Sequence, residues 1–159
     1  MSDRLLHIYI NDHLGAATAG REVTKRCLES NTGTPLGDFL KQLLREINED
    51  RATVEEVLAA TSGRRDRFKP AVGWMAEKAG RLKLNGQLRG YSPLSRVEEL
   101  EGISAGVEAK KAMWIAFQLL GDPRLAGFDF DNLIQRASAQ REGLERFRKD
   151  AVAQAFGRR

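Results

Sequence analysis

The chain has 159 residues, of which 42% are hydrophobic and 30% are charged, and its formal net charge is +4. This composition predicts one soluble domain, residues 1–159, and excludes both a disordered chain and a transmembrane helix, which needs roughly 18 uninterrupted apolar residues. The single cysteine, Cys27, excludes an internal disulfide and a multi-cysteine zinc site, and we expect it to pack as a small apolar residue. The first ten residues include Asp3, Arg4 and His7, which do not fit a secretory signal, so we expect a cytoplasmic protein.

Two long helices are predicted in the first part of the chain, at about residues 3–30 and 35–61, because apolar residues recur there at helical spacing. The run Asn-Thr-Gly at 31–33 interrupts the pattern, and Thr34 and Pro35 restart it. Threonine is a favoured N-cap, and proline is tolerated at the first helical position because its missing N–H would have no partner there. The short turn makes these two helices an antiparallel pair.

A second pair of long helices is predicted at about residues 93–120 and 129–156. Ser92 and Pro93 repeat the combination of N-cap and first-position proline, and Asp129 is the expected N-cap of the last helix. The joint between these helices is also short, so this pair is predicted to be antiparallel as well.

The connection between the two pairs, residues 62–92, is long and contains a predicted short amphipathic helix at about 69–84. A helix of about 27 residues is about 40 Å long, and a connection of this length can run back along it. The second and third long helices are then parallel. The predicted fold class is all-α, a four-helix bundle of two antiparallel hairpins joined by a long crossover.

Three short runs carry a resemblance to a known superfamily. They are the six residues from Tyr9 (YINDHL), the eight from Ala79 (AGRLKLNG) and the seven from Gly90 (GYSPLSR). They are similar to runs in small uncharacterised bacterial proteins assigned to the ferritin-like superfamily, and the resemblance covers nearly the whole chain. It implies a ferritin-like four-helix bundle. It implies no reaction, because those relatives have no assigned activity.

The resemblance raises the question of a dinuclear metal site at the bundle centre. Such a site takes about four carboxylates and two histidines, including a Glu-x-x-His on each of two helices. This sequence contains no Glu-x-x-His. Its histidines, His7 and His13, both fall on the first helix and about 240° apart around it, so both cannot face inward. The sequence therefore predicts a degenerate metal site, and no cofactor is expected.

Asp50 is the most informative acid, because it interrupts the apolar stripe between Ile47 and Val54. If Asp50 is buried, its charge needs a partner such as His13, an arginine or a metal ion. Five residues are predicted to lie near one height of the bundle and are candidate ligands for iron or manganese: His13, Glu46, Asp50, Glu108 and Glu142.

The same residues also fit structural roles. Glu108 and Glu142 can face water or pair with Lys111 or Arg141, and Asp50 can belong to a buried polar layer. A lone helical histidine such as His13 is more often a hydrogen-bonded structural residue than a ligand. The sequence leaves these alternatives open.

Small residues gather near mid-bundle on three predicted helices, within 15–20, 102–109 and 137–139. Glycine inside a helix costs roughly 1 kcal/mol relative to alanine, so several glycines at one level indicate that backbones, or a bound molecule, come close there. Close helix packing, a small central cavity lined by the acids, or a subunit interface would each explain them. A homo-oligomer formed through helix faces is one of these alternatives.

The excess positive charge lies in one segment. Residues 62–96 carry nine basic and two acidic side chains, whereas 1–61 carry seven and ten, and 97–159 carry ten and ten. The candidate anion-binding residues are Arg64, Arg65, Arg67 and Lys69. They suit phosphate groups of nucleic acid or lipid, but they equally complement the acidic first hairpin, so we do not expect a nucleic-acid or membrane partner.

The sequence favours a non-catalytic structural or interaction protein, of unknown partner, without a complete dimetal site. One alternative is a carboxylate-rich bundle that binds iron or manganese and acts as an oxidase or in iron handling. A second alternative is anion binding by the basic crossover. The sequence does not decide whether the protein is an enzyme.

Overall fold

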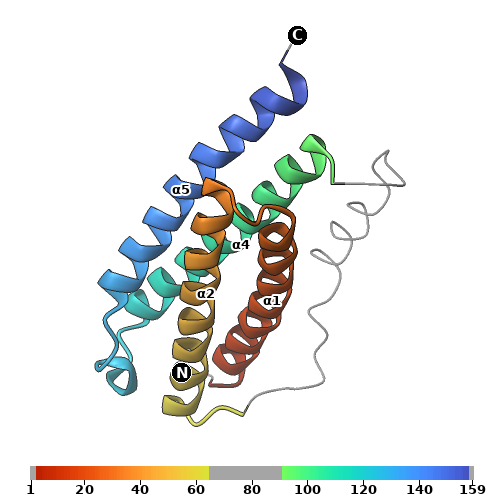
Figure 1. Cartoon of the computed structure of the whole chain (residues 1–159). Coiled ribbons are helices and arrows are strands. Elements are labelled where there is room, and N and C mark those ends of the chain that lie inside the picture. Colours follow the sequence, from red (N-terminus) through yellow and green to blue (C-terminus); the bar gives the residue numbers. More distant parts are fainter. Residues whose placement is uncertain (1–2, 65–90, 158–159) are drawn as a thin grey trace.

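The computed structural model describes residues 3–64 and 91–157. These ranges contain no strand and form α1 (Asp3–Ser30), α2 (Pro35–Ala60), α4 (Pro93–Leu120), the 3-10 helix η1 (Pro123–Leu125) and α5 (Phe130–Phe156), shown in Figure 1. The predicted all-α class is confirmed, with four long helices whose ends lie within one residue of the expected ones. The short helix predicted at 69–84 lies outside the described residues. Within the described part, no helix is long and apolar enough to cross a membrane.

Side-chain caps begin three of the long helices, as the sequence predicts. The hydroxyl of Thr34 accepts a hydrogen bond from the Gly37 N–H at 3.1 Å. The hydroxyl of Ser92 accepts from the Ser95 N–H at 3.0 Å, and the Asp129 carboxylate caps α5 in the same way. Each cap satisfies an amide that has no partner inside the helix. These helix starts are therefore determined by local sequence.

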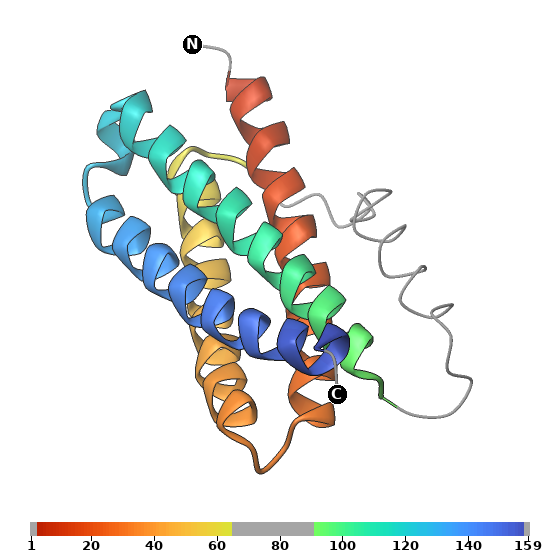
Figure 2. The same ribbon diagram turned by 90° about the horizontal axis from the view of Figure 1, so that it is seen from above.

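The four long helices form two antiparallel hairpins, α1 with α2 and α4 with α5, and α4 also lies beside α1 (Figure 2). At one end of the bundle, the ring of His7 in α1 donates to the carbonyl of Thr61, just after α2, at 2.9 Å. At the opposite end, the side chain of Asn31, after α1, donates to the hydroxyl of Tyr91, just before α4, at 3.0 Å. The starts of α2 and α4 are therefore at the same end, and these two helices run in the same direction.

The buried apolar residues form two clusters, one toward each end of the bundle. The first, near the turn between α1 and α2, extends to Ile47 on α2 and Val107 on α4. The second begins at Val54 on α2 and Met113 on α4. Since the break falls at the same level of both helices, the intervening residues form a layer across the middle of the bundle.

Gly37, in the first turn of α2, lies against the turn that follows α1. A Cβ atom at this position would lie only 2.2 Å from the backbone oxygen of Asn31, so the backbone would have to move. We expect Gly37→Ala to lower the free energy of unfolding by about 1–3 kcal/mol in urea denaturation. The matched control is Gly102→Ala in α4, where a Cβ meets no described atom within 4 Å. It is expected to raise the free energy of unfolding by up to about 1 kcal/mol. The same change in both variants would contradict the close approach at Gly37.

Candidate functional site

Asp50 is the centre of the candidate site, in the layer between the two apolar clusters. Its side chain is only 3% exposed. Both carboxylate oxygens are bound by cations from the other hairpin, Oδ2 by the ammonium of Lys110 on α4 and Oδ1 by the guanidinium of Arg136 on α5. The arginine that the sequence suggested as a partner for a buried Asp50 is found, and a lysine joins it.

The ion pairs extend into a chain of hydrogen bonds across three helices. Lys110 Nζ also donates to the side-chain oxygen of Gln140 at 2.6 Å, and the Gln140 amide donates to Glu46 Oε2 at 2.7 Å. Arg136 also donates to Glu49 at 3.0 Å. Buried charges are tolerated only when their polar atoms are matched in this way. We name this group, Glu46, Glu49, Asp50, Lys110, Arg136 and Gln140, the central ion network.

The charged groups of the network affect the protonation of Lys110. Burial lowers the pKa of Lys110 below its ordinary value of 10.5, while the negative charge of Asp50 acts in the opposite direction. An opposite charge in contact favours the ammonium form, so Asp50 offsets part of the effect of burial. The Asp50 carboxylate, with both oxygens engaged by cations, is poorly placed to act as a base.

Two of the predicted metal candidates lie on the outside of the bundle. Glu108 is exposed and pairs with Arg141 at 2.5 Å, one of the pairings that the sequence allowed. Glu142 is exposed as well. In residues 3–64 and 91–157, no three or more His, Cys, Asp and Glu side chains come together as a group that could hold a metal ion. The structure thus brings Glu46 and Asp50 into one network and leaves Glu108 and Glu142 apart from it.

His13 lies beside the same cavity as Asp50, but it is not a member of the central ion network. Its ring packs edge-on against Tyr9, with the ring centroids 4.6 Å apart. His13 and Asp50 both line a cavity of about 60 Å³ enclosed by α1, α2 and α4. A small central cavity was one of the explanations for the small residues at this level, and only one of the predicted acids, Asp50, lines it.

The glycines near this level do not owe their presence to tight packing. At Gly20, Gly102 and Gly106, an added Cβ would meet no described atom within 4 Å. Close approach of the described helices therefore does not explain these three glycines. Gly20 and Gly106 line the cavity, whereas Gly102 does not.

The candidate anion site is described only at its first residue. Arg64 is exposed just after α2, and its backbone carbonyl accepts a hydrogen bond from the Asn11 side chain at 3.1 Å. Arg65, Arg67 and Lys69 lie outside the described residues. Anion binding by this segment stays a prediction.

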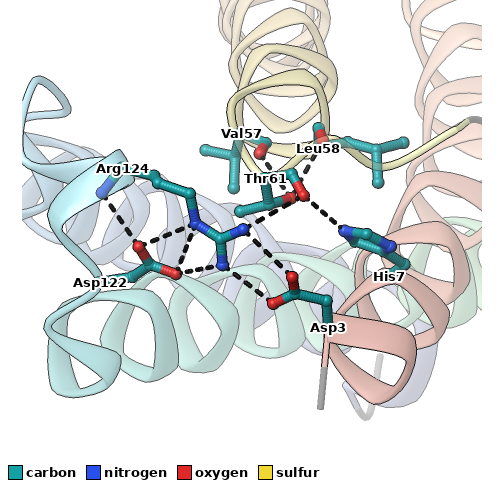
Figure 3. Close-up of polar contacts among 7 residues, drawn as sticks. All are labelled: Asp3, His7, Val57, Leu58, Thr61, Asp122 and Arg124. Carbon is teal, nitrogen blue, oxygen red and sulfur yellow. Dashed lines mark hydrogen bonds and ion pairs between the residues drawn. The ribbon is translucent and has the colours of Figure 1, made fainter. Parts of the chain in front are cut away.

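A second polar cluster lies at the end of the bundle where α1 begins and α2 ends (Figure 3). Arg124 donates to the carboxylates of Asp122 at 2.6 Å and Asp3 at 2.9 Å, and these bonds lower the pKa of both acids. The carbonyl of Thr61 accepts from Arg124 at 3.4 Å and from His7 at 2.9 Å. This cluster ties the start of α1, the end of α2 and η1 together, which is a structural role.

Cys27 lies at the opposite end and is fully buried. Burial raises the pKa of its thiol to about 12, so the thiol is protonated and unreactive near neutral pH. The Tyr91 hydroxyl lies 3.6 Å from the sulfur, and Asn31 contacts both. These contacts agree with the packing role expected for Cys27.

Four members of the network were not predicted as site residues: Glu49, Lys110, Arg136 and Gln140. A search for metal ligands selects acids and histidines and therefore passes over a lysine and a glutamine. A signal was nevertheless present, because Lys110 follows Val107 by three residues and precedes Trp114 by four, on the apolar face of its helix. Gln140 follows Ala137 by three residues in the same manner. Polar residues that interrupt three apolar stripes at one level indicate a polar layer.

Removal of the buried carboxylate tests the network. Asp50→Ala removes the buried carboxylate that Lys110 and Arg136 share and leaves Lys110 with only the neutral acceptor Gln140, so we expect a loss of about 3–5 kcal/mol in the free energy of unfolding, measured in urea. The matched control Glu108→Ala removes an exposed carboxylate from Arg141 and should cost less than about 1 kcal/mol. A small loss for Asp50→Ala, similar to that of the control, would show that the network does not stabilise the bundle.

The surroundings of His13 predict its titration. Burial lowers its pKa below the ordinary value of 6.5, while the nearby Asp12 raises it. NMR of the ring should give a midpoint below 6.5, and Asp12→Asn should lower it further. Because the folded chain favours the neutral ring, its contribution to stability is complete above the pKa of the unfolded chain and is lost as the pH falls through the folded pKa. His13→Gln should therefore reduce the decline in stability between about pH 7.5 and 5, and an unchanged decline would contradict this.

The described side chains thus assemble a layer of paired charges around the buried Asp50, next to a small cavity. Comparison of the chain with known protein families, curated proteins and solved structures gave no match. The function is therefore argued from the contacts within the chain itself.

Proposed function

We propose that this protein is a ferritin-like helical bundle in which charged side chains, in place of a metal pair, hold the centre, and that it acts as a non-catalytic structural or interaction protein. The helix directions support the topology. The described chain leaves α2 at one end of the bundle, at Thr61, and resumes at the other end, at Tyr91. Two antiparallel hairpins joined by one long crossover are typical of ferritin-like folds.

The observation that carries the proposal is the pairing of Asp50 with Lys110 and Arg136. In dimetal bundles, carboxylates from several helices converge on the centre, and the metal ions balance their charge. Here two cations of the chain itself bind both oxygens of the most buried carboxylate. A divalent ion approaching these oxygens would meet two positive charges within a few ångströms, in surroundings that screen charge poorly. The network therefore supports a metal-free centre.

A structural layer of this kind has a recognised use. Buried ion pairs contribute little net stability compared with apolar packing, but in some proteins they fix the register of neighbouring helices. Asp50 lies on the first hairpin, and its partners Lys110 and Arg136 lie on both helices of the second. By joining the two hairpins, the network would keep the outer faces of the bundle in one arrangement. A structural or interaction protein needs such fixed faces, and the network supports this role.

Metal analysis of the purified full chain tests the proposal. The protein is prepared without chelator and without nickel affinity, and iron and manganese are counted per chain. We expect far less than one metal ion per chain, and no rise in melting temperature when Fe²⁺ or Mn²⁺ is added, because a ligand that binds only the folded state would raise it.

The result that would overturn the proposal is close to two ions per chain that are lost in Glu46→Ala. The matched control for that variant is Glu56→Ala, which removes an exposed acid from the same helix. Loss of metal in both variants would indicate adventitious binding at the surface, and this result would agree with a metal-free centre.

A further inference from the structure

The cavity between α1, α2 and α4 is not used by the proposed function. We propose that it binds a small uncharged molecule with a mostly apolar surface, of about four to six non-hydrogen atoms. The cavity measures about 60 Å³, and a water-sized group occupies roughly 10–15 Å³ of such space, which sets this size. The proposal goes beyond the structural role of the bundle and does not depend on it.

The walls of the cavity are apolar for most of their extent. Aliphatic side chains from α2 and α4 contribute Ile47, Val54, Ile103 and Met113, and α1 contributes alanine and glycine. Apolar cavities of sufficient size stay dry and accept apolar guests, because water inside them lacks hydrogen-bond partners. The lining therefore favours an apolar guest.

Three polar groups at the cavity, those of Asp50, Lys110 and Thr24, are already engaged in hydrogen bonds. Asp50 is bound by two cations, and Lys110 donates to both Asp50 and Gln140. The hydroxyl of Thr24, fully buried, donates to the backbone oxygen of Gly20 at 2.8 Å. A buried water needs two to four polar partners, and these three groups have little bonding capacity left for it. The other polar residues of the lining are His13 and Arg51, and Arg51 is ion-paired with Glu55 at 3.1 Å. An ion would meet the negative charge of Asp50 and the positive charges of Lys110 and Arg51 at once, so an uncharged guest fits better.

Two glycines maintain the space. Gly20 on α1 and Gly106 on α4 both line the cavity, and a Cβ at either would meet no described atom within 4 Å. Glycine destabilises a helix interior relative to alanine. Since alanine would clash with nothing described at either position, packing gives no reason for glycine. A Cβ at Gly102 would also meet no described atom, and what distinguishes Gly20 and Gly106 is that both line the cavity.

The cavity also has a route to the surface. Its lining includes Ala109, which is exposed on α4, and Ala16, Ala17 and Gly20 of α1, which are half-buried. These small residues of α1 and α4 are where the cavity lies nearest to the surface of the described part of the chain.

Xenon is a suitable probe, because it is uncharged, apolar and fits the volume. Amide NMR spectra of the full-length protein are recorded at rising xenon pressure. We expect saturable shifts at the amides of residues that line the cavity, including Gly20 and Gly106, and no saturable shifts near Gly121 at the end of α4. A water molecule held firmly in the cavity and not displaced by xenon would overturn the proposal.

Two matched variants test whether xenon binds in the cavity. The double variant Gly20→Ala with Gly106→Ala adds two methyl groups at the lining, and we expect xenon affinity to fall about tenfold or more. Gly102→Ala makes the same exchange one turn earlier on α4, outside the lining, and should bind xenon as the unmodified chain does. Loss of fold would not explain weaker binding, because both variants replace glycine by a better helix former. Equal affinity in the double variant and the control, or no saturable shift in the unmodified chain, would refute the site.

Discussion

The charge of Asp50 is the constraint on which the arrangement of the bundle depends. A carboxylate that is 97% buried costs several kcal/mol unless it is paired and hydrogen-bonded. Its partners, Lys110 and Arg136, both belong to the hairpin opposite its own. The charge is satisfied only when the two hairpins dock at one height. A slip of one helical turn, about 5.4 Å, would separate the carboxylate from both cations.

The two apolar clusters drive the association of the helices, whereas the central ion network selects their register. Burial of apolar surface drives association but does not specify one register, because it is non-directional. The clusters end at Ile47 and Val107 on one side and begin again at Val54 and Met113 on the other. The charged layer occupies the gap, where its directional bonds select one register. The cavity lies at the same level, where the small residues of α1 do not fill the space beside the layer.

The two ends of the bundle are fastened by separate polar contacts. At one end, Arg124 joins Asp3, Asp122 and the Thr61 carbonyl (Figure 3). At the other, Tyr91 meets Asn31 and the buried Cys27 beside the turn between α1 and α2. Neither of these two clusters pairs a nucleophile with a base. The chemistry of the described residues therefore depends on the central ion network. There Lys110 and Arg136 bind both carboxylate oxygens of Asp50.

The sequence by itself determined the helices. The caps at Thr34 and Ser92 and the spacing of apolar residues act over one or two turns, so local sequence fixes where each helix begins and which face it buries. The sequence also identified Asp50 as the anomaly in its stripe. Only the tertiary structure decided which groups meet it, because Lys110 and Arg136 lie 60 and 86 residues away along the chain. The cavity likewise depends on three helices at once. Pairing and empty volume arise when helices dock, and docking is not encoded in any single stretch of the chain.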